Sequence, residues 1–192
     1  MNKSRTLIRD VVERIEPFDE QEGAVVRQVL GWLDEGRELY RTSKPDVPPE
    51  HLVSYFVLVD HSRRSLLLVN HLKAGLWLPI GGHVEPGEDP RGTVLREMAE
   101  ELGPKAAMVA SVAMMPLFIT ATQTRGAGRH TDVSLWYVVA GDERMWLDPD
   151  PREFRGHRWQ SFDSVLATDI DMLDPEMHRF VRKLKGRLGL PD

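Results

Sequence analysis

Cysteine is absent from the 192-residue chain. Without a thiol, the protein has no disulfide framework, no thiolate metal site and no cysteine nucleophile. Long apolar runs are missing as well. The first residues, MNKSRTLIRDVVERIE, contain no apolar stretch of signal-peptide length, and no later run approaches the length of a membrane span. We therefore expect a cytoplasmic protein without a membrane partner.

An excess of positive charge is also missing. The chain has 25 Lys and Arg residues against 30 Asp and Glu residues, so its formal net charge is -5. A protein that coats nucleic acid needs a basic surface, and we therefore expect no nucleic-acid partner. Free nucleotides stay among the candidate ligands, because divalent cations can bridge acidic side chains to phosphates. The length suits one well-buried domain with an appendage.

Two amphipathic helices are predicted near the N-terminus, over residues 4–16 and 19–36. The second opens with Asp19 and has Glu22 three residues later, which is the spacing of a capping box. The proline-rich segment 41–51 can be neither a helix nor a central strand. We expect this segment to link the helices to the main body.

The main body reads as a mixed α+β pattern. Strands are predicted over 52–60, 65–71, 76–82, 108–123, 130–141 and 157–160, and helices over 90–102 and 175–188. Strands with one inserted helix and a closing helix predict a mixed sheet rather than a regular βαβ series. We divide the chain into a helical N-terminal extension, 1–45, and one domain, 46–192.

The segment 81–103 carries the strongest chemical pattern. Its residues Glu97, Glu100 and Glu101 are spaced at i, i+3 and i+4, so they share one face of the predicted helix. Like charges at these spacings destabilise a helix by a few tenths of a kcal/mol, on the order of 0.2–0.5 per pair. Hard cations such as Mg²⁺ bind such carboxylate groups. A solvated acidic helix face is the alternative interpretation.

The spacing around these glutamates favours the metal site, because it resembles the Nudix box. That pattern is a glycine, five residues, Glu, seven residues, Arg-Glu, an apolar residue, any residue, Glu-Glu, any residue and a glycine. The matching positions are Gly82, Glu88, Arg96, Glu97, Met98, Glu100, Glu101 and Gly103. The one departure is Pro104, where the family usually has an aliphatic residue. Proline shortly after a C-terminal glycine is a normal helix stop, so we expect only the helix exit to change.

The resemblance covers residues 50–170 and implies a Nudix-type α/β/α sandwich with a mixed β-sheet, preceded here by the helical extension. It also implies a metal-dependent hydrolase, a pyrophosphatase that acts on acid anhydrides. Its substrate would be a nucleoside triphosphate, or a nucleoside diphosphate linked to another moiety, cut at a phosphoanhydride bond. The expected cofactor is Mg²⁺, with Mn²⁺ as a substitute.

The resemblance further assigns roles to residues. The implied metal ligands are the carbonyl of Gly81 and the carboxylates of Glu97, Glu100 and Glu101. Proton removal from water would fall to Glu100, Glu101 or the later Glu153, a choice that the pattern leaves open. Support of the box is implied for Gly82, Glu88, Arg96 and Gly103, with an ion pair between Glu88 and Arg96.

Substrate contacts are expected from five further residues. His83 lies inside the box loop, and the strand that starts at His130 places His130 and Asp132 on one face. Arg125 and Arg129 flank a glycine-rich hairpin tip, where they could meet phosphates. The alternative for each is an ordinary solvent-exposed side chain.

Two other functions are compatible with parts of this pattern. A catalytically silent, nucleotide-sensing Nudix-like domain is the alternative, although such domains often lack box glutamates and this chain has them all. An isomerase of isoprenoid diphosphates on the same fold is disfavoured, because its relatives use a cysteine. The N-terminal helices could pair two subunits into a homodimer, cover the cleft or cap the sheet.

Overall fold

The computed structural model describes residues 3–44, 46–124 and 129–191. Two helices open the chain, α1 (Lys3–Glu13) and α2 (Glu20–Asp34). The predicted cap of α2 is present, because the Asp19 carboxylate accepts a hydrogen bond from the Glu22 N–H at 2.9 Å. The Glu22 carboxylate accepts the Phe18 N–H at 2.6 Å instead of the N–H of Asp19 itself, so the box is shifted by one residue.

The strands and later helices follow in one continuous series. They are β1 (Glu50–Asp60), β2 (Ser65–His71), β3 (Trp77–Leu78), β4 (Ile80–His83), α3 (Pro90–Glu101), α4 (Pro104–Val109), β5 (Ser111–Val112), β6 (Phe118–Gln123), β7 (Thr131–Ala140), β8 (Phe154–Ser161), α5 (Phe162–Ala167), the 3₁₀ helix η1 (Ile170–Met172) and α6 (Met177–Arg187). Within the described residues, no helix is both long enough and apolar enough to cross a membrane.

The described strands form one mixed sheet of eight strands in the order β3-β2-β1-β7-β5, with β4 also paired to β1, β6 to β7 and β8 to β2. The β1–β7 pair is parallel and runs from Glu50 opposite Thr131 to Val59 opposite Ala140. The β1–β4 pair is antiparallel and places His83 opposite Val53. The N-terminal end of β1 therefore lies beside both the start of β7 and the end of β4.

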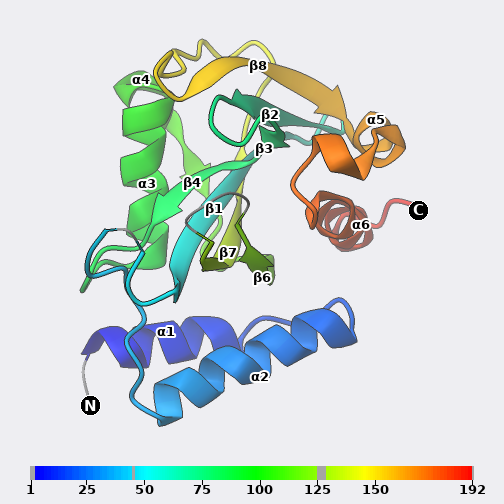
Figure 1. Ribbon diagram of the computed structural model, residues 1–192. Coiled ribbons are helices and arrows are strands. Elements are labelled where there is room, and N and C mark those ends of the chain that lie inside the picture. The colour runs from blue at the N-terminus through cyan, green and yellow to red at the C-terminus, as the bar shows by residue number, and fades with distance from the viewer. Residues whose placement is uncertain (1–2, 45, 125–128, 192) are drawn as a thin grey trace.

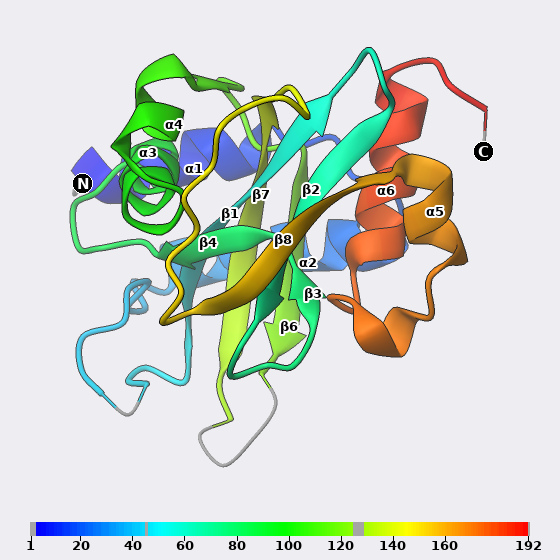
Figure 2. The ribbon, with the colours of Figure 1, turned by 90° about the horizontal axis from the view of Figure 1, so that it is seen from above.

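Helices cover both faces of this sheet, as Figures 1 and 2 show. Alternate residues of β1 serve opposite faces: Phe56 and Leu58 pack with α3, whereas Val57 and Val59 pack with α5 and α6. Both sets are fully buried. The expected sandwich of helices, mixed sheet and helices is confirmed.

The N-terminal helices pack against this same sheet. The apolar face of α2, made of Val25, Val29, Trp32 and Leu33, is buried in one core with α3 and the sheet. Burial within its own chain leaves this face no free apolar surface for a second subunit. Capping of the sheet is thus the role that the structure shows, while the boundary at residue 46 and the homodimer stay predictions.

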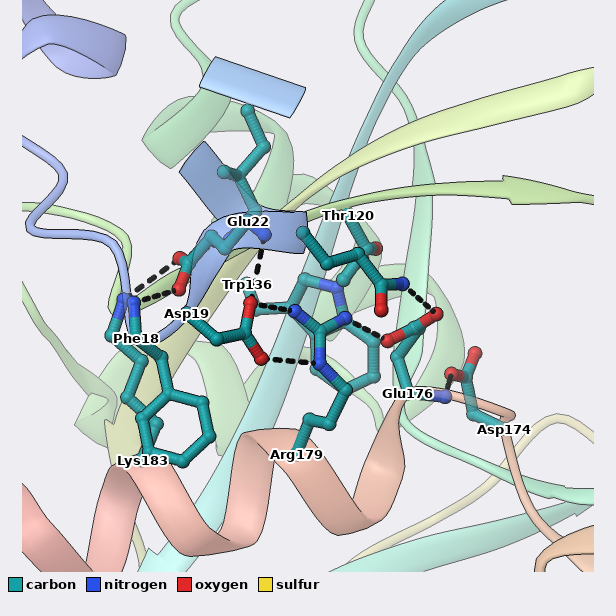
Figure 3. A network of polar contacts seen from close by, with 11 residues as sticks. Phe18, Asp19, Glu22, Thr120, Trp136, Asp174, Glu176, Arg179 and Lys183 are labelled. Carbon is teal, nitrogen blue, oxygen red and sulfur yellow. Dashed lines mark hydrogen bonds and ion pairs between the residues drawn. The ribbon is translucent and has the colours of Figure 1, made fainter. Parts of the chain in front are cut away.

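Polar contacts tie α2 to α6 at the far end of the chain (Figure 3). The buried Glu22 carboxylate accepts a hydrogen bond from Lys183 Nζ at 2.7 Å and another from the Ile119 N–H at 3.1 Å. Asp19 accepts from Arg179 Nε at 2.9 Å. The second and last helices, α2 and α6, are therefore held together through charged groups.

The segment 108–123, predicted as one strand, is the largest local difference. Its first two residues, Met108 and Val109, end the helix α4 instead, and only the short β5 and then β6 are strands. Pro104 is well placed at the first turn of a helix, and Ala106 and Ala107 favour helix. The hairpin between β6 and β7 is present as an antiparallel pair.

Candidate active site

The loop from β4 to α3 places the acidic helix against the sheet. The Asp89 carboxylate accepts the Arg91 N–H at 3.0 Å and caps α3, and Pro90 occupies its first turn. At the other end Gly103 has φ 89°, in the left-handed region that glycine adopts without a steric penalty. Met98 and Leu102 are fully buried, so the opposite side of the helix carries the carboxylates.

An ion pair between Glu88 and Arg96 holds the loop onto this helix. Arg96 Nε lies 3.0 Å from Glu88 Oε1, and Arg96 Nη2 donates to Glu88 Oε2 at 3.1 Å and to the His83 carbonyl at 3.0 Å. Burial opposes ionisation of Glu88, but the hydrogen bonds from Arg96 and Thr93 lower its pKa overall. Arg96 is therefore occupied within the protein.

A cavity of about 490 Å³ lies between α3, β4 and the loop before β8. The box residues that line it are Gly81, Gly82, His83, Glu85, Arg96, Glu97 and Glu101. Glu153, from the loop before β8, lines the same cavity, as do Asp132 and the basic residues Arg41, Lys44 and Lys73. Among the described residues, α1 and α2 contribute nothing to this lining, so they do not cover the cleft.

The carboxylates in the cavity are poorly compensated. Glu101 is 8% exposed, and its Oε2 is buried with no hydrogen-bond partner. Burial raises the pKa of Glu101 to about 9, and the neighbouring Glu97 and Glu153 carboxylates add to this effect. Burial also raises the pKa of Glu97, although Arg96 opposes the shift. An oxygen-rich, negatively charged site of this kind fits a hard divalent cation, which would offset the repulsion.

The third glutamate of the predicted face is placed differently. The Glu100 side chain is 61% exposed, lies 3.8 Å from Arg96 Nη1, and is not among the residues that line the cavity. The structure thus brings Glu97, Glu101 and Glu153 together, and Glu100 lies at the edge of this group. Its role as a ligand stays a prediction.

Only some of the residues expected to contact the substrate line the cavity. His83 and Asp132 line the cavity. His130 is partly buried, with Nε2 3.1 Å from Asp132 Oδ1, while Arg129 is exposed. Arg125 lies outside the described residues, so its expected contact stays a prediction.

Sequence reasoning missed the basic side of the cavity. Arg41 and Lys44 lie in the proline-rich segment that we expected to be only a link, and Lys73 lies in the turn after β2. Prolines indicate that a segment is neither helix nor central strand, but they do not indicate where it lies. Two basic residues within four positions of a proline cluster were the only signal in the sequence.

Comparison with known proteins agrees with this geometry. A sequence model of the family described as NUDIX domain matches residues 49–184. This chain belongs to the Nudix family. The box glutamates and the Glu88–Arg96 pair described above are therefore those of a Nudix hydrolase.

Two curated relatives cover most of the chain. It is 37% identical over 147 residues to the Bacillus subtilis (strain 168) protein named "Putative 8-oxo-dGTP diphosphatase", an alignment that covers 70% of this chain and 95% of the relative. It is 24% identical over 157 residues to Nudix hydrolase 25 of Arabidopsis thaliana, covering 71% and 87%.

Solved structures support the same fold. The crystal structure of a NUDIX family hydrolase from Clostridium perfringens matches with a TM-score of 0.54 at 18% identity, covering 71% of this chain and 97% of that one. DR0079 from Deinococcus radiodurans matches with a TM-score of 0.55 at 18% identity, covering 76% and 88%. At such identities the likeness concerns the fold alone.

Proposed function

We propose that this Nudix hydrolase cleaves a phosphoanhydride bond in a nucleoside triphosphate, or in a nucleoside diphosphate linked to another moiety, with Mg²⁺ as its cofactor. The observation that carries the proposal is the group Glu97, Glu101 and Glu153, which line one cavity while Glu101 Oε2 has no hydrogen-bond partner. Three neighbouring carboxylates destabilise the protein unless positive charge compensates them, so a functional reason for their position is required.

The proposed metal ligands are the Gly81 carbonyl and the carboxylates of Glu97, Glu100 and Glu101. Their oxygen donors suit Mg²⁺, and Mn²⁺ accepts the same donors. When bound, the metal would neutralise the diphosphate oxygens and ease deprotonation of an attacking water.

The protein's own side chains then divide the remaining work. Glu100, Glu101 or Glu153 would take a proton from water, and the position of Glu101 and Glu153 in the cavity lining supports these two. Arg96 cannot bind phosphate while it holds Glu88 and the His83 carbonyl, so it positions the adjacent Glu97 instead. Arg41, Lys44 and Lys73 supply positive charge for the phosphates.

Substrate choice rests on the opposite part of the cavity. The Asp132 carboxylate lines the cavity and lies with Oδ1 3.1 Å from His130 Nε2, and as an acceptor it suits an N–H or O–H donor of a base or sugar. We propose substrate contacts for Asp132, which lines the cavity, and for the exposed Arg129. The name of the Bacillus subtilis relative makes 8-oxo-dGTP the first compound to try. The cytoplasmic location stays a prediction.

The proposal is tested by a product-release screen of the full-length protein with Mg²⁺. The panel holds 8-oxo-dGTP, the ordinary nucleoside triphosphates, dinucleoside polyphosphates and nucleotide sugars. We expect at least one class to yield two phosphorylated products, and chelation of the metal to stop the reaction. A folded protein that is inert on every compound but binds a nucleotide would instead establish the silent, nucleotide-sensing alternative.

Gly82 provides a test that separates the site from the fold. A Cβ at Gly82 would overlap the Glu97 carboxylate, which is the mobile end of a side chain and can move aside. We expect Gly82→Ala to raise the Mg²⁺ concentration for half-maximal activity by about 10–100-fold, the effect of disturbing a ligand's support. Its free energy of unfolding should change by less than about 1 kcal/mol.

The matched control is Gly92→Ala on α3. There the added Cβ would meet only ordinary contacts, the nearest being Asp89 Cβ at 3.8 Å, and alanine favours helix. The activity of both variants is measured as a function of Mg²⁺ concentration, and their free energies of unfolding are measured with denaturant. Equal Mg²⁺ dependence in the two variants would show that Glu97 does not need its present position.

A further inference from the structure

Three histidines from distant parts of the chain meet beside the cavity. His51 lies on β1, His83 ends β4, and His130 immediately precedes β7. The parallel β1–β7 pair and the antiparallel β1–β4 pair bring them together. The His51 ring centroid lies 4.8 Å from that of His83 and 5.0 Å from that of His130. Asp46, from the proline-rich segment, completes a group whose ligand atoms lie within 4.8 Å of one another.

His51 is held in a form that can bind a metal. Its Nδ1 lies 2.8 Å from the Pro48 carbonyl, which can only accept a hydrogen bond, so Nδ1 carries the proton and donates. Its Nε2 therefore presents a lone pair. The side chain is 0% exposed, and Nε2 has no hydrogen-bond partner. Metal-ligating histidines are typically oriented by donation of the other ring nitrogen to a carbonyl or carboxylate.

His83 offers a second ring nitrogen. Its Nε2 is buried without a hydrogen-bond partner, and Arg96 fixes its backbone through the carbonyl. A neutral imidazole is the form that coordinates a metal.

Two carboxylates approach this group from outside the ring cluster. Asp46 Oδ2 lies 3.4 Å from His130 Nδ1. Asp132 Oδ1 lies 3.1 Å from His130 Nε2 and 3.5 Å from His51 Nε2. One divalent cation would neutralise both aspartates and would satisfy the buried lone pairs of His51 and His83.

We propose that Asp46, His51, His83 and His130 form a second metal site, for Zn²⁺, separate from the carboxylate site of the box helix. Three imidazoles and one carboxylate are a donor set for zinc, whereas Mg²⁺ prefers oxygen ligands alone. At Zn–N distances of about 2.0 Å, tetrahedral ligand atoms lie about 3.3 Å apart, so the group closes by roughly 1.5 Å at most on binding. Asp132, whose Oδ1 lies 3.1 Å from His130 Nε2, orients that imidazole from beside the site.

Four protein ligands make this a structural rather than a catalytic zinc site. It joins the box loop, through His83, to the segment of Asp46, which also carries Arg41 and Lys44. Arg41 Nη1 already lies 3.4 Å from Asp46 Oδ1. The bound ion would thus fix the segment that carries Arg41 and Lys44 relative to the box loop.

The test is a titration of metal-free, full-length protein with Co²⁺ in the presence of excess Mg²⁺, followed by displacement with Zn²⁺. Tetrahedral nitrogen ligation gives Co²⁺ an intense visible absorption that an octahedral oxygen site lacks. We expect one equivalent per chain, and a higher melting temperature with Zn²⁺. His83→Ala and His130→Ala should each weaken binding at least 10-fold; both retain the fully buried His51, so the fold is less disturbed.

Two control variants locate the ion. His61→Ala removes an exposed histidine in the β1–β2 turn, and Glu97→Gln removes a carboxylate of the box helix. Both should bind Co²⁺ as the wild type does. The proposal is overturned if the wild type shows no tetrahedral band, if the His83 and His130 variants bind equally well, or if Glu97→Gln abolishes binding. None of these measurements depends on hydrolysis. A protein that hydrolyses no compound in the activity screen would therefore still be tested for zinc binding.

Discussion

Glu101→Gln is expected to lower the rate of hydrolysis by about 10²–10⁴-fold, the range for loss of a positioned acid or base, without a loss of stability. Glutamine keeps the shape of the side chain and removes the negative charge. In the absence of metal, burial and the neighbouring Glu97 and Glu153 carboxylates raise the pKa of Glu101 to about 9, so the side chain is protonated near pH 7 and a neutral glutamine costs no stability there. Initial rates with Mg²⁺ and the free energy of unfolding in chelator are the two measurements.

Glu35→Gln is the control, because Glu35 is an exposed residue at the end of α2 and is not among the residues that line the cavity. It should change neither quantity. A Glu101→Gln protein that keeps more than a tenth of the wild-type rate would remove Glu101 from the reaction. A large loss of stability would instead show that the carboxylate has a structural role that the contacts do not reveal.

The same substitution at Glu100 addresses the one box glutamate that lies outside the cavity lining. A loss comparable with that of Glu101→Gln would mean that Glu100 turns from Arg96 toward the metal when the metal is present. An effect below about 10-fold would mean that it stays paired with Arg96, 3.8 Å away.

Local patterns in the sequence predicted most of this site. The cap at Asp19 is present, as is the helix that carries the glutamates. The Glu88–Arg96 pair joins residues only eight positions apart, so the spacing of the motif was enough to indicate it. Such features depend on neighbours along the chain, and one sequence contains that information.

The parts that escaped prediction depend on contacts between distant segments. His51, His83 and His130 become neighbours only through the order and direction of β1, β4 and β7, which composition and periodicity do not specify. Arg41 reaches the cavity for the same reason. The exposure of Glu100 has another cause: a 100° step per residue spreads three glutamates over an arc, and the helix orientation decides which of them face the cavity.

Lys183→Met is expected to cost about 3–5 kcal/mol of folding free energy, because it leaves a buried carboxylate without its cationic partner. The Glu22 carboxylate is 0% exposed, and Lys183, itself 10% exposed, is its cationic partner at 2.7 Å (Figure 3). Methionine fills the space of the lysine stem but leaves the buried charge with backbone N–H donors only. The difference in unfolding free energy between wild type and variant is measured by denaturant unfolding, with the same slope m fitted to both proteins.

Arg182→Met is the matched control, because Arg182 is the preceding residue of α6 and is exposed. It should change stability by no more than about 0.5 kcal/mol. If Lys183→Met also changed the stability by no more than this, the charged contacts between α2 and α6 would contribute little to the folding free energy. Apolar packing alone would then hold the N-terminal helices. If the large cost is found, those helices belong to the same cooperative unit as the Nudix fold, since the ion pair joins residues 161 positions apart. Removing residues 1–45 would then unfold the enzyme rather than only expose its sheet.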